Sequence, residues 1–275
     1  MRSIAFMYFE VISNYLKIKF CRIPKYMNLI SLKYLISVFF LWHCMLFGHE
    51  TETNKPFEKM HVHQTFSAHA HAGWESRYFS EGRDSLNGKS LWNSSLELGY
   101  DHFSGGVWYG RSSNHQYDEL QYNFALTQEI DEYSFYAGYT HLLFPKDDES
   151  DDEWSLGISY EGLPFELTTS LDASYSMDAK GTFYEWSSTR EFHPQEDLDI
   201  SLSGTFGWNE GYVSDGHNGL NFFSLGSGAK KILSESFSLL GHGVYSWAID
   251  PDSNLAGDQD LKDFFHFGLG VEFDF

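Results

Sequence analysis

The last ten residues, HFGLGVEFDF (266–275), decide the fold class. Large apolar residues occupy every second position from 265 onward, namely Phe265, Phe267, Leu269, Val271, Phe273 and Phe275. Small or polar residues fill the positions between them, as expected for the two faces of a β-strand. Six large apolar side chains on one face need apolar surroundings. The segment 264–275 is therefore predicted to be a strand with one face in an apolar environment.

The same two-residue period recurs along the chain after residue 64, and no stretch follows the period of a helix. The predicted strands are 65–79, 91–103, 106–112, 119–128, 133–143, 154–160, 165–177, 182–190, 198–208, 219–229, 236–247 and 264–275. Twelve is an even number, and their spacing suits membrane-spanning strands of about 9–11 residues. We predict an all-β protein, an up-and-down, 12-stranded antiparallel transmembrane β-barrel.

The predicted joins alternate between short and long, which is typical of short periplasmic turns and longer extracellular loops. Short joins are expected at 104–105, 129–132, 161–164 and 230–235, and longer, acidic ones at 80–90, 112–119, 144–153 and 248–263. A soluble β-sandwich or jelly roll also alternates. Aromatic residues near strand ends favour the barrel, because they suit two interfacial girdles. These are Tyr133, Trp154, Tyr160, Tyr175, Trp208 and Trp247.

The N-terminal part differs in composition from the rest. Residues 1–48 hold six of the 18 Lys and Arg but one of the 39 Asp and Glu. An apolar run over 34–47 is shorter than the about 20 residues of a spanning helix and suits a secretory signal. We expect an extension plus signal peptide over 1–48, with Met27 as the true start, a flexible lead-in over 49–64, and an outer-membrane barrel over 65–275. A retained anchor helix is the alternative for the apolar run.

Charge and cysteine content limit the partners. The formal net charge is −21, which argues against nucleic acid because phosphate binding needs a basic surface. The two cysteines, Cys21 and Cys44, both precede the predicted barrel, so the barrel has no disulfide framework. The expected partners are outer-membrane lipid, the outer-membrane assembly machinery and small solutes. The sequence does not indicate an oligomeric state.

Two segments resemble a known family. Residues 68–110, AHAHAGWESRYFSEGRDSLNGKSLWNSSLELGYDHFSGGVWYG, resemble the opening strands of the TorF-like porins. The matching positions are Trp74, Ser76, Tyr78, Gly82, Arg83, Gly105, Gly106 and Trp108, and 129–145 resembles a mid-barrel hairpin of that family. The resemblance implies a bacterial outer-membrane barrel with pore function and brings no catalytic residue. The loops at 147–153 and 248–263 depart from the family pattern, so no solute preference is carried over.

The last strand also resembles the C-terminal signal that the assembly machinery of bacterial barrels recognises. This resemblance rests on the alternating residues from Phe265 to the terminal Phe275. We therefore predict that these six apolar residues form both the lipid-facing side of the closing strand and an assembly signal.

Polar positions of the predicted strands define the expected lumen. The pore-lining candidates are His69, His71, Glu75, Arg77, Glu97, Glu166, Asp172, Asp199, Glu272 and Asp274, with Arg111 and Arg190 as further basic candidates. Their acidic excess, together with acidic mouth loops, should concentrate cations. We predict a narrow, weakly cation-selective pore for small solutes. The alternative is a non-conducting surface barrel that binds a partner or a divalent metal through its acidic loops and its His-rich first strand.

Histidines and serines in and just before the barrel segment are the residues that could bind a metal or act in catalysis. His61, His63, His69 and His71 form two His-x-His pairs whose imidazoles lie close enough to share a metal ion. Polar filling of the lumen is the simpler interpretation, and we predict no metal site and no cofactor. No G-x-S-x-G motif accompanies the many serines, and neither Ser76 nor Ser80 can be linked to His141. No enzymatic activity is predicted.

Overall fold

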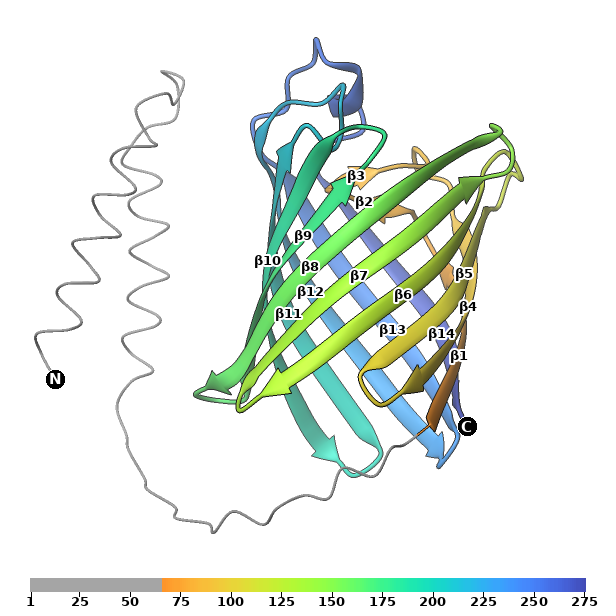
Figure 1. The fold of residues 1–275 in the computed structure, drawn as a ribbon, viewed down its shortest axis with the longest axis vertical. Coiled ribbons are helices and arrows are strands. Elements are labelled where there is room, and N and C mark those ends of the chain that lie inside the picture. Colours follow the sequence, from red (N-terminus) through yellow and green to blue (C-terminus); the bar gives the residue numbers. More distant parts are fainter. Residues whose placement is uncertain (1–65) are drawn as a thin grey trace, which may run out of the picture. The chain divides into compact units, whose positions relative to one another are not determined.

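The computed structural model describes residues 66–275, which form a closed antiparallel barrel of twelve strands (Figure 1). The barrel strands are β1 (Phe66–Glu75), β4 (Leu91–Tyr100), β5 (Phe103–Ser112), β6 (Asp118–Ile130), β7 (Tyr133–Phe144), β8 (Glu149–Leu163), β9 (Leu167–Ser176), β10 (Gly181–Gln195), β11 (Leu198–Glu210), β12 (Gly219–Ser234), β13 (Phe237–Ala248) and β14 (Phe264–Asp274). The predicted fold class is confirmed. The signal peptide, the Met27 start, the lead-in, His61 and His63 lie outside the described residues.

Each strand pairs with its neighbours in sequence, and β1 closes the barrel by pairing with β14. Trp74 lies opposite Leu269 and His69 opposite Asp274, so outward residues pair with outward ones and inward with inward. Closure leaves no unpaired strand edge, which a chain needs if it is to cross lipid. The register of β14 is therefore set by β13 over residues 264–273 and by β1 over residues 268–274.

The two ends of the barrel differ in their connections. At the end that carries the C-terminus, strands are joined by two- or three-residue turns at 101–102, 131–132, 164–166, 196–197 and 235–236. At the other end the connections span 76–90, 113–117, 145–148, 177–180, 211–218 and 249–263. The last of these holds a short 3₁₀ helix, Ala256–Asp258. Among residues 66–275, no helix is long and apolar enough to cross a membrane.

Three predicted joins were wrong. Ser104 and Gly105 lie within β5, and the chain turns at Asp101, whose φ of 55° is left-handed. Gly105 lies opposite Phe124 on the neighbouring strand β6. The acidic run 149–153, predicted as part of a long loop, belongs to β8, where it pairs with β7 from Thr140 to Phe144. Segment 230–234, predicted as a turn, continues β12.

Burial is inverted relative to a soluble protein. The exposed outer surface carries large apolar side chains such as Trp92, Phe124, Leu156 and Leu269, each more than half exposed. The buried set of residues includes many polar ones, among them Asp84, Glu119, Asn209 and Asp258. Five of the six aromatic residues proposed for the girdles, including Trp154 and Trp208, are exposed, and Tyr160 is partly buried. Apolar groups therefore face outward, and the interior is polar.

Candidate functional site

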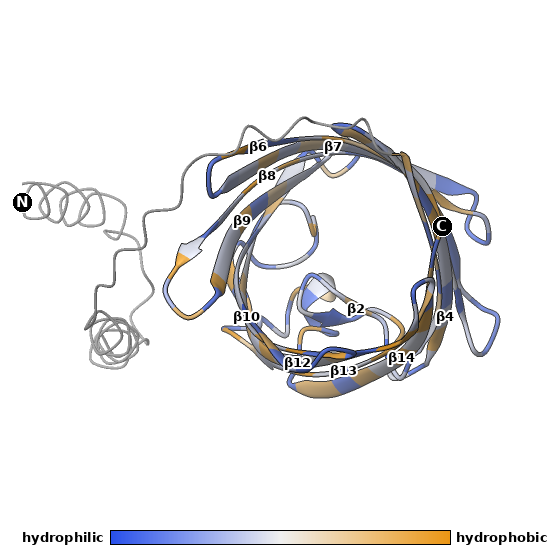
Figure 2. Ribbon diagram, turned by 90° about the horizontal axis from the view of Figure 1, so that it is seen from below, coloured by the Kyte–Doolittle hydropathy of each residue, from blue (hydrophilic) through white to orange (hydrophobic). Residues whose placement is uncertain are grey.

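A short hairpin lies inside the barrel. It is formed by β2 (Phe79–Ser80) and β3 (Arg83–Asp84), in the connection between β1 and β4, and β2 lies within the barrel outline when viewed along its axis (Figure 2). Its two-residue turn has Glu81 at φ 47° and Gly82 at φ 81°, the conformation of a tight hairpin turn. A Cβ at Gly82 would lie 2.5 Å from Phe222, so only glycine fits this close approach.

Phe79 packs the hairpin against one side of the inner wall. Its ring centroid lies 5.3 Å from that of Phe222 on β12, 5.8 Å from Phe264 and 5.0 Å from His266 on β14. Phe222 is fully buried. This cluster is the main apolar contact of the hairpin with the wall.

Tyr78 ties the base of the hairpin to the β5–β6 side. Its ring stacks on Trp108 at 6.3 Å, and its hydroxyl donates to Glu119 Oε2 at 2.8 Å. Tyr117 donates to the same carboxylate, and Gln121 donates to its other oxygen at 2.5 Å. Burial, and then the nearby Glu119 charge, raise the pKa of Tyr78 well above its usual range. The segment that carries the hairpin thus contacts walls formed by β5–β6 and by β12–β14.

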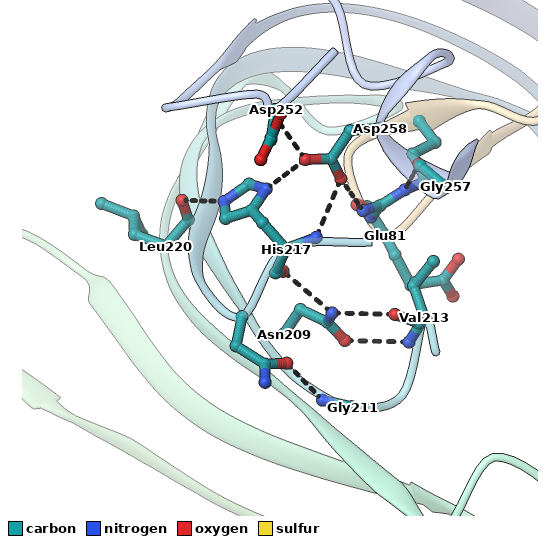
Figure 3. A network of polar contacts seen from close by, with 11 residues as sticks. Glu81, Asn209, Gly211, Val213, His217, Leu220, Asp252, Gly257 and Asp258 are labelled. Atoms are coloured by element: carbon teal, nitrogen blue, oxygen red, sulfur yellow. Dashed lines mark hydrogen bonds and ion pairs between the residues drawn. The ribbon is translucent and has the colours of Figure 1, made fainter. Parts of the chain in front are cut away.

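Asp258 attaches the hairpin to the loops at the end of the barrel that carries the longer connections (Figure 3). Its side chain is fully buried and accepts from Arg83 Nη2 at 3.0 Å, the Asp252 backbone N–H at 2.9 Å, the His217 N–H at 3.2 Å and His217 Nδ1 at 2.6 Å. Burial would raise the pKa of Asp258, but the hydrogen bonds from Asp252 and His217 outweigh it and lower that pKa. One carboxylate therefore joins the hairpin to two loops, 211–218 and 249–263.

Arg83 and Asp84 complete this attachment. Arg83 is 6% exposed and donates through Nε to the Gly257 carbonyl at 2.6 Å. Burial lowers the pKa of Arg83, while Asp258 acts in the opposite direction. Asp84, which is fully buried, accepts from Arg77 and from the Gly88 N–H at 2.9 Å.

A cavity of ≈ 320 Å³ lies beside the hairpin. Four acidic residues line it, and none of its lining residues is basic: Phe79, Ser80, Glu81, Glu153, Asp172, Ser174, Phe183, Glu185 and Tyr212. Burial raises the pKa of Glu81 to about 7, while a hydrogen bond from Ser80 acts in the opposite direction. Tyr212 donates to Glu153 across the cavity edge. The arrangement presents negative charge to the lumen without a positive partner among the lining groups.

Several predicted lumen residues lie in ion pairs along the β1–β14 side. His69 contacts Asp274, Glu75 lies 3.0 Å from His242, and Glu272 accepts from Lys230. His71 lies opposite Glu272 in the β1–β14 ladder, and its ring lies beside Gly270. Glu97 is directly across from His69 in the β1–β4 ladder. Among these contacts, the Glu272–Lys230 pair joins an acid to a permanently charged base, whereas Asp274 and Glu75 contact histidines.

The other predicted residues have different placements. Asp172 lines the cavity, and Asp199 lies 2.7 Å from His193. Arg77 follows β1 and pairs with Asp84 of the hairpin. Glu166 was wrongly placed on a strand, because it lies in the β8–β9 turn at φ 57°.

Sequence reasoning missed three cavity carboxylates and misjudged two cations. Glu81 and Glu153 were assigned to loops. Glu185 was not singled out, although it lies two positions after Phe183 on the same inner face of β10. Arg190 stacks over Phe165 and Phe192 on the outer side, and Arg111 is paired with outward-facing Trp92. The charged interior is therefore more acidic than expected.

Comparison with known proteins gives the fold class a precedent. No family model matches the chain, and neither does any curated protein. The solved structure of the KdgM porin superposes with a TM-score of 0.52 at 8% identity, covering 76% of this chain and 99% of that one. The fold is that of a porin barrel. At this identity the likeness concerns the fold alone.

Two further solved porins and channels are similar at lower scores. An outer membrane channel from Pseudomonas putida F1 gives a TM-score of 0.49 at 11% identity, covering 82% of this chain and 100% of that one. The NanC porin gives 0.48 at 10% identity, covering 75% and 98%. The resemblance to the TorF-like porins stays a prediction. Within residues 66–275, no three His, Cys, Asp or Glu side chains come together as a metal-binding group.

Proposed function

We propose that this protein is a bacterial outer-membrane porin whose barrel forms a narrow, weakly cation-selective pore for small solutes. The observation that carries the proposal is the cavity beside the hairpin. Glu81, Glu153, Asp172 and Glu185 converge on it, and no basic residue lines it.

Membrane insertion is supported by the outer surface. Side chains such as Phe124, Leu156 and Leu269 are between 59% and 63% exposed on the outer face of a closed barrel. In water this surface would far exceed the apolar patches of a soluble monomer. In lipid it is the expected apolar band, because the closed sheet satisfies every backbone group internally.

Cation preference is supported by the balance of inner charges. The basic groups Arg77, Arg83 and Lys230 each contact an acid, namely Asp84, Asp258 and Glu272. The cavity carboxylates have no such partner among the residues beside them. A lumen of low-dielectric walls concentrates the field of such charges on a passing ion.

A narrow bore is supported by strand number and by the hairpin. Barrels of about 8 strands are filled by their own side chains, while those of about 16–18 leave an aqueous channel. Twelve strands lie between these limits. The hairpin occupies part of this interior: Phe79 contacts β12, and the preceding Tyr78 contacts β5. The remaining path therefore suits small solutes.

Liposome swelling tests the proposal. Purified protein that shows heat-modifiable migration is reconstituted, and swelling is compared for a cationic and an anionic organic solute of similar size. We expect the cation to enter faster at low salt. Equal entry of both solutes, or faster entry of the anion, would contradict the cation preference, and no entry of either would contradict the pore.

A further inference from the structure

We propose that the β2–β3 hairpin is a displaceable gate that narrows the pore, and that Asp258 is the residue that holds it in the narrowed position. The inference rests on the proposed pore function, since a gate acts on a passage. It concerns how that passage is regulated. Two opposing sets of contacts carry it, one that holds the hairpin and one that disfavours its present position.

Polar holding contacts of the hairpin converge on Asp258, beside the ring contacts of Phe79 and the hydrogen bond from Arg83 Nε to the Gly257 carbonyl. Asp258 accepts four hydrogen bonds, and the one from Arg83 is the charged link that reaches the hairpin. Hydrogen bonds to charged groups are the strong ones in proteins. Arg83 is almost fully buried, so loss of the Asp258 charge would leave a buried cation without its counter-ion. Release of the hairpin would return that cation to water.

The opposing contacts lie on the wall behind the hairpin. Both ring nitrogens of His266 are buried without a hydrogen-bond partner among residues 66–275, and Phe79 lies against that ring at 5.0 Å. Nearby on β12 and β13, the amide of Asn221 and the hydroxyl of Ser246 are likewise buried and unpaired among the described residues. Buried unpaired polar groups are rare and unfavourable. Movement of Phe79 away from the wall would let water reach His266.

The hairpin is lightly attached by its backbone. Its two strands pair over only two residue pairs, and one isolated bridge, Arg83 to Leu261, links it to the loop 249–263. Asp84 adds one backbone hydrogen bond to Asp260 at 3.1 Å. Segments with few backbone hydrogen bonds to their surroundings open more readily than a continuous ladder, and the apolar contacts of this hairpin are those of Phe79 and Gly82. The hairpin can therefore move while the barrel ladder stays intact.

The first experiment compares D258N with D250N in planar bilayers. Asp250 is exposed in the same loop, so its substitution removes the same charge without touching the network. We expect D258N to raise the open probability or the single-channel conductance at least about two-fold, because the charged link to Arg83 is lost, with D250N like the wild type. D258N channels that match the wild type would overturn the proposal.

A second readout does not depend on conductance. S246C places a thiol on the inner wall and leaves His266 in place, because Ser246 is 1% exposed and lies opposite Phe264, whose ring contacts Phe79. Residues 66–275 hold no cysteine, so Cys21 and Cys44 are replaced if they are present. Alkylation of the S246C thiol by a small charged maleimide should be slow and should rise about ten-fold or more when D258N is added. An unchanged rate would overturn the gate even where the pore conducts. A raised rate in a protein that never conducts would instead contradict the proposed function alone.

G82A provides a variant that leaves the Asp258 network in place. Its new methyl group would lie 2.5 Å from Phe222, so the hairpin should be pushed from the wall and alkylation in the S246C background should also rise. If D258N does not assemble, this variant tests whether the hairpin can leave the wall. Protection of the thiol in a heat-modifiable G82A barrel would contradict the proposal.

Discussion

Neutralising Glu81 should weaken the cation preference by an amount that follows from the distance between Glu81 and an ion in the cavity. A volume of ≈ 320 Å³ corresponds to a sphere of about 4 Å radius, and two unit charges about 4 Å apart interact by about 1 kcal/mol in water. With a Debye length of about 10 Å at 0.1 M salt, this falls to about 0.7 kcal/mol. Because about 1.4 kcal/mol is a ten-fold change, one charge enriches a monovalent cation about three-fold and depletes an anion equally.

E81Q should therefore lower the cation-to-anion permeability ratio by up to about ten-fold at 0.1 M salt and by about two-fold at 1 M, where the Debye length is about 3 Å. The pKa of Glu81 is raised to about 7, so its charge is present above that pH and lost below it. The wild-type ratio should rise as the pH passes upward through 7, and the E81Q ratio should lack this component.

The assay is the zero-current potential of single channels in a KCl gradient, measured at pH 6 and pH 8.5. The matched control is E132Q, which neutralises an exposed carboxylate in the β6–β7 turn at the other end of the barrel. We expect E132Q to follow the wild type. An E81Q potential equal to that of the wild type at pH 8.5 and 0.1 M would refute the assignment of Glu81 to the ion path.

Two further predictions concern attachment and assembly. Tyr78→Phe keeps the ring stack but removes a donor to the buried Glu119, so the hairpin attachment should weaken by about 1–3 kcal/mol. Trypsin should then cut after Arg83 faster than in a control protein with Tyr245→Phe. Equal cleavage rates would contradict this prediction. Phe275 is 77% exposed, and its replacement by Asp should reduce membrane assembly without reducing synthesis. The Phe275→Trp variant should assemble normally. Normal surface-protease protection of the Asp variant would contradict the role of Phe275 as an assembly signal.

The strands could be predicted because their faces depend on local alternation. In β14, Phe265 and Leu269 point outward and His266 and Glu272 point inward, as their sequence positions require. The turn at Asp101 was missed because Ser104-Gly105 is a common turn dipeptide, whereas here both residues pair with β4 inside β5.

The hairpin could not be predicted from its own residues. SEGRDSLNGKS (80–90) is polar and charged, like an exposed loop. Its inward position depends on Asp258, which lies 175 residues from Arg83 in the sequence, and on Phe222. For the same reason Glu81, Glu153 and Glu185 come together only once three distant segments meet around one cavity. No local pattern contains that information.

The sign of the zero-current potential of the refolded wild-type protein, in a KCl gradient at pH 8.5 and low salt, tests the central claim most directly. A lumen lined by Glu81, Glu153, Asp172 and Glu185 should make the dilute side positive, because K⁺ crosses more readily than Cl⁻. A potential of the opposite sign, or a barrel that inserts and passes no current, would contradict the account.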